Sequence, residues 1–215
     1  MRYQKSITFF NLPNAVVLWA LVMAIIFLLV NIFSLFDKTT IIQQYMFLPW
    51  RDWQWQVFSG IWPYQIITYG FLHGNISHLL FNVVVGVVFS KVIYDALSGW
   101  GWGFVFFTGL CGGAIFHLLT TASDIGIIGS SAGVAAWIGA SLFLAVNDIA
   151  MPPPFETKSR AMFFIIFFLA LNFLTALTAN RLADTAISNA GHLGGLVFGY
   201  LAAWGIILIT SHLRR

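Results

Sequence analysis

The chain has 215 residues, of which 60% are hydrophobic and only 8% are charged, whereas an average soluble domain carries about 25% charged residues. A soluble fold of this size cannot bury so much apolar surface, so lipid must be the solvent for much of the molecule. The formal net charge of +3 comes from basic residues scattered at the ends of apolar runs. This distribution argues against nucleic acid as a partner and is typical of membrane topology signals.

Six apolar segments follow one another, separated by connections too short to hold a separate soluble domain. Each must be a helix, because backbone polar groups in hydrocarbon need partners within the segment, and the uninterrupted runs lack the alternation of a membrane β-barrel. We therefore expect an all-α membrane protein, a compact bundle of six transmembrane helices forming a single domain over residues 1–215 with its core at about 60–210. The segments are roughly 15–36, 77–97, 100–121, 131–146, 161–179 and 190–210.

The first segment follows Arg2 and Lys5, as the apolar core of a signal peptide would. It is longer than the usual ~7–15 apolar residues of such a peptide, and no small-residue cleavage site follows it. We expect it to be retained as the first helix.

The basic residues predict the orientation of the bundle. With six spans and the N-terminus inside, seven lie inside and three outside, which favours cytoplasmic N- and C-termini by the positive-inside rule. This topology matches a bacterial cytoplasmic membrane. The inside set is Arg2, Lys5, Lys91, Lys158, Arg160, Arg214 and Arg215, and the outside set is Lys38, Arg51 and Arg181.

The longest connection runs from Asp37 to about Ile76, on the predicted outer side. Aromatic rings at this density suit the headgroup region of a bilayer, so we expect a long outer loop between helices 1 and 2 that is partly embedded in the membrane. The rings belong to Tyr45, Phe47, Trp50, Trp53, Trp55, Trp62 and Tyr64.

The fourth segment is unusually short. Residues 131–146 offer 16 apolar-compatible positions, fewer than the ~20 of a full span. The stretch before it, 124–130, is not helical in character, and a helix that begins inside the membrane is tolerated only beside protein or a water-filled cavity. A hydroxyl at that buried start is a functional candidate, with helix capping as the alternative.

Polar side chains within spans are costly, so each one is a candidate for function. His78 and Asn82 are four residues apart and share one helix face. His192 precedes Gly195-x-x-x-Gly199, a spacing that lets helix backbones approach closely and could bring His192 to the start of the fourth helix. A glycine packing motif with an incidental histidine is the alternative. The intramembrane candidates are His78, Asn82, His117, Ser130, Ser131 and His192.

A serine and a histidine together predict nucleophilic catalysis. A serine hydroxyl is a weak nucleophile until a base removes its proton, and histidine has a suitable pKa near neutrality. The oxyanion that forms on an attacked amide needs donors, and His78, Asn82 and the backbone N–H of Ser131 are available. No carboxylate within a span is placed to orient His192, which favours a dyad over a triad.

At these positions the chain resembles the rhomboid family of intramembrane serine proteases, in its bacterial six-helix form. Three blocks carry the resemblance: 69–82, which contains His73-x4-His78-x3-Asn82, then Gly129-Ser-Ser-Ala132 and Gly191-His-Leu-Gly-Gly195. The resemblance implies that the site needs no cofactor or metal. It also implies that Gly129, Gly195 and Gly199 are structural residues near the site. It makes Ser131 the nucleophile, His192 the general base, His78 and Asn82 oxyanion donors with Ser131, and His73 a structural residue that helps hold the outer loop.

The family pattern also chooses between adjacent serines. Members usually carry a Gly-Ala pair eight and nine residues after the nucleophile, and Gly139-Ala140 fits Ser131 rather than Ser130. The chain departs from the pattern at three points. Ala132 follows the nucleophile where glycine is common, Ala135 replaces an aromatic residue that packs on the catalytic histidine, and Tyr64-Gln65 stands where a Trp-Arg pair is usual.

The resemblance implies an endopeptidase that cleaves transmembrane segments of membrane proteins near the outer face through an acyl-enzyme. Its partners would be such substrates and membrane lipid, with the phenylalanine-rich fifth helix as a lipid-facing gate. One alternative is a catalytically silent rhomboid-like protein that binds and escorts membrane clients. Another is a small transporter, although the segments show no internal repeat. Metal binding by His73, His78 and His192 is not expected without carboxylate or thiolate partners.

Overall fold

A computed structural model describes the parts of the chain that contain all three sequence blocks. Wherever these residues form regular structure they are helical, apart from one isolated bridge between Phe47 and Ile127. Within the described part of the chain, three helices are long and apolar enough to cross a membrane. The protein is therefore a helical membrane protein, as predicted. The described residues are 11–33, 37–48, 64–120, 126–149, 157, 159–160, 162–164, 166–171, 174 and 188–212.

The first helix, α1 (Asn14–Phe27), continues as the π-helical turn η1 (Leu28–Ile32) and packs through one stripe. The stripe recurs every three or four residues at Val16, Trp19, Met23 and Phe27, all of them buried. This is the spacing of a single helix face. The other faces expose large apolar side chains, as expected of a helix surrounded by lipid.

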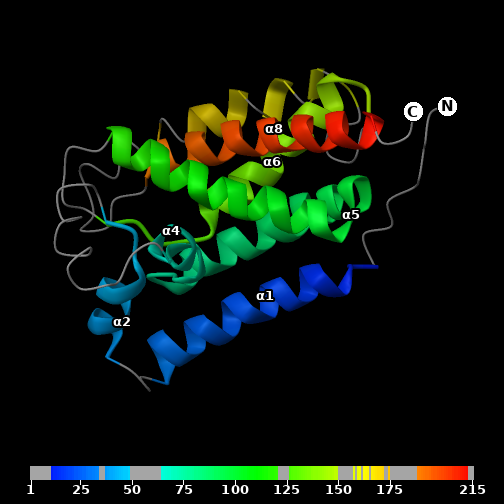
Figure 1. Cartoon of the computed structure of the whole chain (residues 1–215). Helices are drawn as coiled ribbons and strands as arrows, with labels where there is room; N and C mark the ends of the chain where they lie inside the picture. The colour runs from blue at the N-terminus through cyan, green and yellow to red at the C-terminus, as the bar shows by residue number, and fades with distance from the viewer. Residues whose placement is uncertain are drawn as a thin grey trace.

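The longest helix, α5 (Ile76–Thr120), is a helical hairpin. Its backbone leaves helical geometry at Ser98 (φ 68°, ψ 174°), where Figure 1 shows the chain reversing. Both arms meet Trp19 of α1, since Gly86 lies against its ring and Phe106 stacks edge-on at 6.0 Å. The arms are the second and third predicted segments, and the break falls in the predicted gap between them.

The short fourth helix, α6 (Ser131–Val146), has the predicted bounds and is buried along almost its whole length. Sixteen residues make a helix about 24 Å long, less than the ~30 Å hydrocarbon core of a bilayer. Figure 1 shows α6 enclosed by α5 and α8. Such an enclosed position is where a helix too short to span is tolerated.

The last helix, α8 (Asn189–His212), packs on α6 through glycines. A Cβ atom at Gly195 would collide with the carbonyl oxygen of Ala132, and one at Gly199 with that of Ala136. Backbone therefore rests on backbone at both positions, which confirms the close approach predicted from the Gly-x-x-x-Gly spacing.

The described part of the outer connection contains three short helices: α2 (Lys38–Tyr45), α4 (Gln65–Thr68) and η3 (Tyr69–Phe71). After α2 the chain pairs with the stretch before α6, because the Phe47 N–H donates to the Ile127 carbonyl at 3.1 Å and the reverse bond is 2.8 Å. Four of the loop aromatics, Trp50, Trp53, Trp55 and Trp62, lie outside the described residues.

The fifth predicted segment falls only partly on described residues, so the number of six spans stays a prediction. Its described residues between 159 and 174 are helical. Phe164 and Phe168 pack against the core, whereas Phe163 and Phe167 are exposed, which gives the segment one inward and one outward face.

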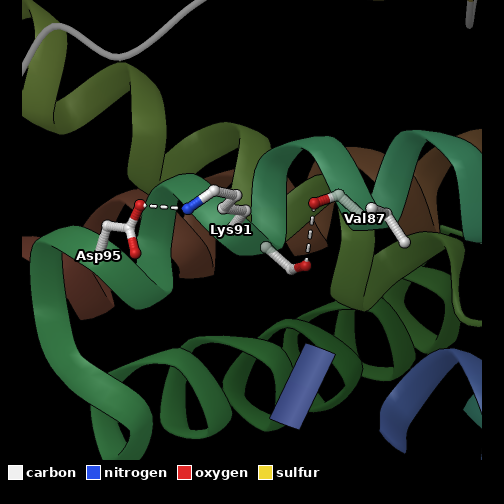
Figure 2. Close-up of polar contacts among 4 residues, drawn as sticks. Val87, Lys91 and Asp95 are labelled. Atoms are coloured by element: carbon white, nitrogen blue, oxygen red, sulfur yellow. Dashed lines mark hydrogen bonds and ion pairs between the residues drawn. The ribbon is translucent and has the colours of Figure 1, made fainter. Parts of the chain in front are cut away.

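An ion pair between a buried lysine and a partly exposed aspartate lies on the first arm of α5, far from the three sequence blocks. The Lys91 Nζ atom is 2.7 Å from the Asp95 carboxylate (Figure 2). The Lys91 side chain is buried, whereas that of Asp95 is partly exposed. The carboxylate therefore serves the lysine as a partner in place of water.

Candidate active site

The start of α5 places His78 and Asn82 against the loop that precedes Ser131. A Cβ atom at Gly129 would lie 2.6 Å from His78 Nε2 and 3.7 Å from Asn82 Nδ2. Gly129 also has φ +117°, a conformation that other residues rarely adopt. The predicted shared face of His78 and Asn82 thus borders the Gly129-Ser-Ser-Ala132 block.

His73 lies in the turn before α5, outside the membrane-spanning helices, and holds this loop from a second side. Its Nε2 atom is 3.3 Å from Ser130 Oγ, and both side chains are buried. Burial lowers the pKa of His73 to about 3, with a further contribution from the neighbouring His78, so its imidazole is neutral at physiological pH. Asn31 donates to the His73 carbonyl at 3.2 Å and ties the turn to η1.

The two adjacent serines occupy different environments. Ser130 is fully buried, and although it stands at the N-cap position of α6 its side chain makes no capping bond. Ser131 is the first helical residue and is half-buried. Helix capping, the alternative explanation of these hydroxyls, is therefore not observed for Ser130. Ser131 also begins a helix whose first N–H groups lack helical partners and point toward any anion placed there.

His192 lies in the first turn of α8, which faces the first turn of α6. Gly195, three residues later, rests on the carbonyl of Ala132, the neighbour of Ser131. The second arm of α5 closes the same junction, because a Cβ atom at Gly113 would lie 2.5 Å from Ala132 Cβ and 3.1 Å from the Gly191 carbonyl. The fold thus brings all three sequence blocks to the end of the bundle where α5, α6 and α8 begin (Figure 1).

A family model described as Rhomboid domain matches residues 61–209, which contain all three sequence blocks. The chain belongs to the rhomboid family. Among curated proteins, it is similar to the RHOMBOID-like protein 6, mitochondrial, of Arabidopsis thaliana, with 25% identity over 160 residues. The match covers 74% of this chain and 48% of the relative, so the chain spans about half the length of the curated relative it matches.

One departure from the rhomboid pattern has a structural counterpart near His192. Ala135, where an aromatic residue is usual, is a buried methyl group within α6. An aromatic ring instead comes from the fifth segment: the Phe168 ring centroid lies 6.4 Å from that of His192, at an interplanar angle of 48°. Sequence reasoning missed this contact because it joins two different helices.

The departure at Tyr64-Gln65 also has a structural counterpart, at the end of α2. Gln65 Nε2 donates to the Gln44 carbonyl at 2.8 Å, and the Tyr64 hydroxyl donates to the same oxygen at 3.4 Å. Thr68 Oγ1 donates to the Tyr45 carbonyl at 3.0 Å. The last carbonyls of a helix lack helical partners, so these side chains satisfy the end of α2. In this rhomboid chain, Tyr64-Gln65 anchors the described part of the outer loop.

Proposed function

We propose that this chain is an intramembrane serine endopeptidase with Ser131 as nucleophile and His192 as general base. The observation that carries the proposal is the junction of the two first turns, where Gly195 of α8 lies directly on Ala132 of α6. This contact places the turn containing His192 beside the turn that starts with Ser131. The rhomboid family membership of the chain supports the same chemistry.

In the proposed reaction His192 removes the Ser131 hydroxyl proton as Oγ attacks the carbonyl carbon of a substrate peptide bond. The C–N bond then breaks, His192 returns the proton to the leaving amine, and an acyl-enzyme remains. Water, deprotonated by His192, hydrolyses this ester and regenerates the serine. No carboxylate is required to complete this sequence.

The oxyanion of each tetrahedral intermediate needs donors that are already in place. Asn82 supports this role, because its Nδ2 atom is buried and has no hydrogen-bond partner among the described residues. A buried donor without an acceptor is rare in folded proteins and calls for an explanation. The Ser131 backbone N–H and the His78 ring complete the proposed set of donors.

The substrates would be transmembrane segments that unwind at the end of the bundle where α5, α6 and α8 begin. This end combines the polar side chains of the three sequence blocks with the start of α6, whose first residue is half-buried. With the predicted topology this end faces outward, so cleavage would occur near the outer surface and water would enter from that side.

The test is cleavage of a model transmembrane substrate in detergent and in proteoliposomes. Ser131→Ala and His192→Ala should each lower the rate by roughly 10³-fold or more, as for other serine hydrolases. Ser141→Ala is the matched control on the same helix, since this buried hydroxyl has no partner among the described side chains. A fluorophosphonate probe should label wild type and the Ser141 variant at Ser131.

Retained cleavage in either dyad variant would refute the assignment. A folded wild type that neither cleaves nor becomes labelled, yet retains membrane clients, would favour the silent escort protein instead.

A further inference from the structure

The first turn of α8, which contains His192, is capped by Ser188. Ser188 precedes the helix, and its Oγ atom accepts the Gly191 N–H at 3.0 Å while its carbonyl accepts the His192 N–H at 3.1 Å. A serine that binds the N–H three residues later is the usual N-cap arrangement. The backbone of His192 is therefore held directly by the capping residue.

The cap is in turn attached to another helix through His117. The His117 Nδ1 atom is 2.8 Å from Ser188 Oγ, although 71 positions separate the two residues. His117 belongs to the second arm of α5 and is only 3% exposed. The serine hydroxyl can accept the Gly191 N–H and donate its own proton to Nδ1 of a neutral imidazole, so the hydroxyl proton and the buried Nδ1 atom are both paired.

The same face of α5 also reaches the nucleophile side of the site. Gly113 lies one turn before His117, between Ala132 of α6 and the Gly191 carbonyl of α8. The ring of Phe47 lies 6.5 Å from that of His117, and Phe47 pairs with Ile127 just before the serine block. His117 thus stands between the segment leading to Ser131 and the cap of the helix that contains His192.

We propose that His117 is a positioning residue for proteolysis. It acts through Ser188 to fix the position of His192 along the axis of α8, and its rotation about that axis, relative to Ser131. This inference rests on the proposed Ser131–His192 dyad. A displacement of about 1 Å at a reacting group can lower a rate on the order of 10²-fold. Loss of the Nδ1–Oγ bond would free the first turn of α8 to make such a shift without removing any catalytic group.

The experiment compares His117→Ala, His117→Asn, Ser188→Ala and the double alanine variant in the full-length protein. Asparagine keeps a polar atom close to the position of Nδ1, so it should restore the bond. We expect each single alanine variant to lower kcat by roughly 10–100-fold with KM changed less than twofold. His117→Asn should recover most of kcat, and the double variant should be no slower than the single ones, because both remove one interaction.

Rates are divided by the fraction of enzyme that fluorophosphonate labels at completion, which removes the effect of unfolded protein. Leu119→Ala is the control, since this neighbour on α5 is 76% exposed and should keep the wild-type kcat. Three outcomes would each overturn the inference. These are an unchanged kcat per labelled enzyme in His117→Ala, a loss of kcat in His117→Asn as large as that in His117→Ala, and additive losses of kcat in the double variant. If His117→Ala does not fold, the kcat values of Ser188→Ala and His117→Asn test the inference in its place. A wild type without labelling or cleavage overturns the dyad itself, which separates the two failures.

Discussion

Single glycines control how closely the two proposed catalytic helices approach. Gly195 and Gly205 lie on the same helix but face different surroundings: a Cβ atom at Gly195 would meet the Ala132 carbonyl, whereas no described atom lies within 4 Å of one at Gly205. The role of Gly195 is thus steric rather than conformational, since its backbone is ordinary helix.

We predict that Gly195→Ala destabilises the fold by about 1–3 kcal/mol, because backbone atoms cannot yield as a flexible side chain can. It should also lower proteolysis beyond the loss of stability, since α8 must move away from α6 and takes His192 with it. Thermal unfolding in detergent and cleavage per labelled enzyme measure the two effects.

Gly205→Ala is the matched control, and alanine in an open helical position is favoured over glycine by roughly 0.5–1 kcal/mol. If Gly195→Ala and Gly205→Ala have the same unfolding temperature and the same cleavage rate per labelled enzyme, the contact between α6 and α8 does not position the site.

At the scale of elements, the fifth segment supplies an aromatic contact that α6 lacks. Phe164 and Phe168 lie four residues apart and face the core, and the Phe168 ring approaches His192. Movement of this segment would therefore change the packing around the proposed base. The Phe168 ring thus connects the segment predicted to be the gate with the proposed general base.

Phe168→Ala should lower kcat by about tenfold, since misplacing a catalytic group by a fraction of an ångström already costs a large part of the rate. Phe167→Ala, on the exposed face of the same segment, should leave kcat near that of wild type. Cleavage kinetics of both variants against one substrate give the comparison, and an equal response would exclude a specific role for Phe168.

At the scale of the whole molecule, the proposed site and the Lys91–Asp95 ion pair occupy opposite ends of the first arm of α5. His78 and Lys91 are 13 residues apart along the helix, or about 20 Å. The start of α1 and the end of α8 lie together at the end of the bundle away from α2 (Figure 1). The placement of both termini on the cytoplasmic side stays a prediction.

Single-cysteine labelling tests the predicted orientation. In a Cys111→Ala background, Thr39→Cys on α2 should react with a membrane-impermeant maleimide added to intact cells. Asp148→Cys, after the end of α6, should react only once the membrane is permeabilised, because charge asymmetry holds that end inside. Both positions are exposed on the surface of the protein. The reverse pattern would place the proposed site on the inner face.

The sequence by itself determined the helical membrane class, the rhomboid family and the bounds of α6. These features are encoded locally, in the length of an apolar run or in the spacing of His73, His78 and Asn82 along a few turns. The reversal at Ser98 was also foreseen, since two apolar runs are separated there.

Only the tertiary structure decided what surrounds the proposed dyad. It joined His117 to Ser188, brought Phe168 to His192 and placed Gln65 on the end of α2. None of these pairs has a periodic signature, because its members belong to separate elements and meet only when the helices pack. A side chain's partner across such an interface depends on the crossing of the helices, which small residues such as Gly195 set by close backbone contact.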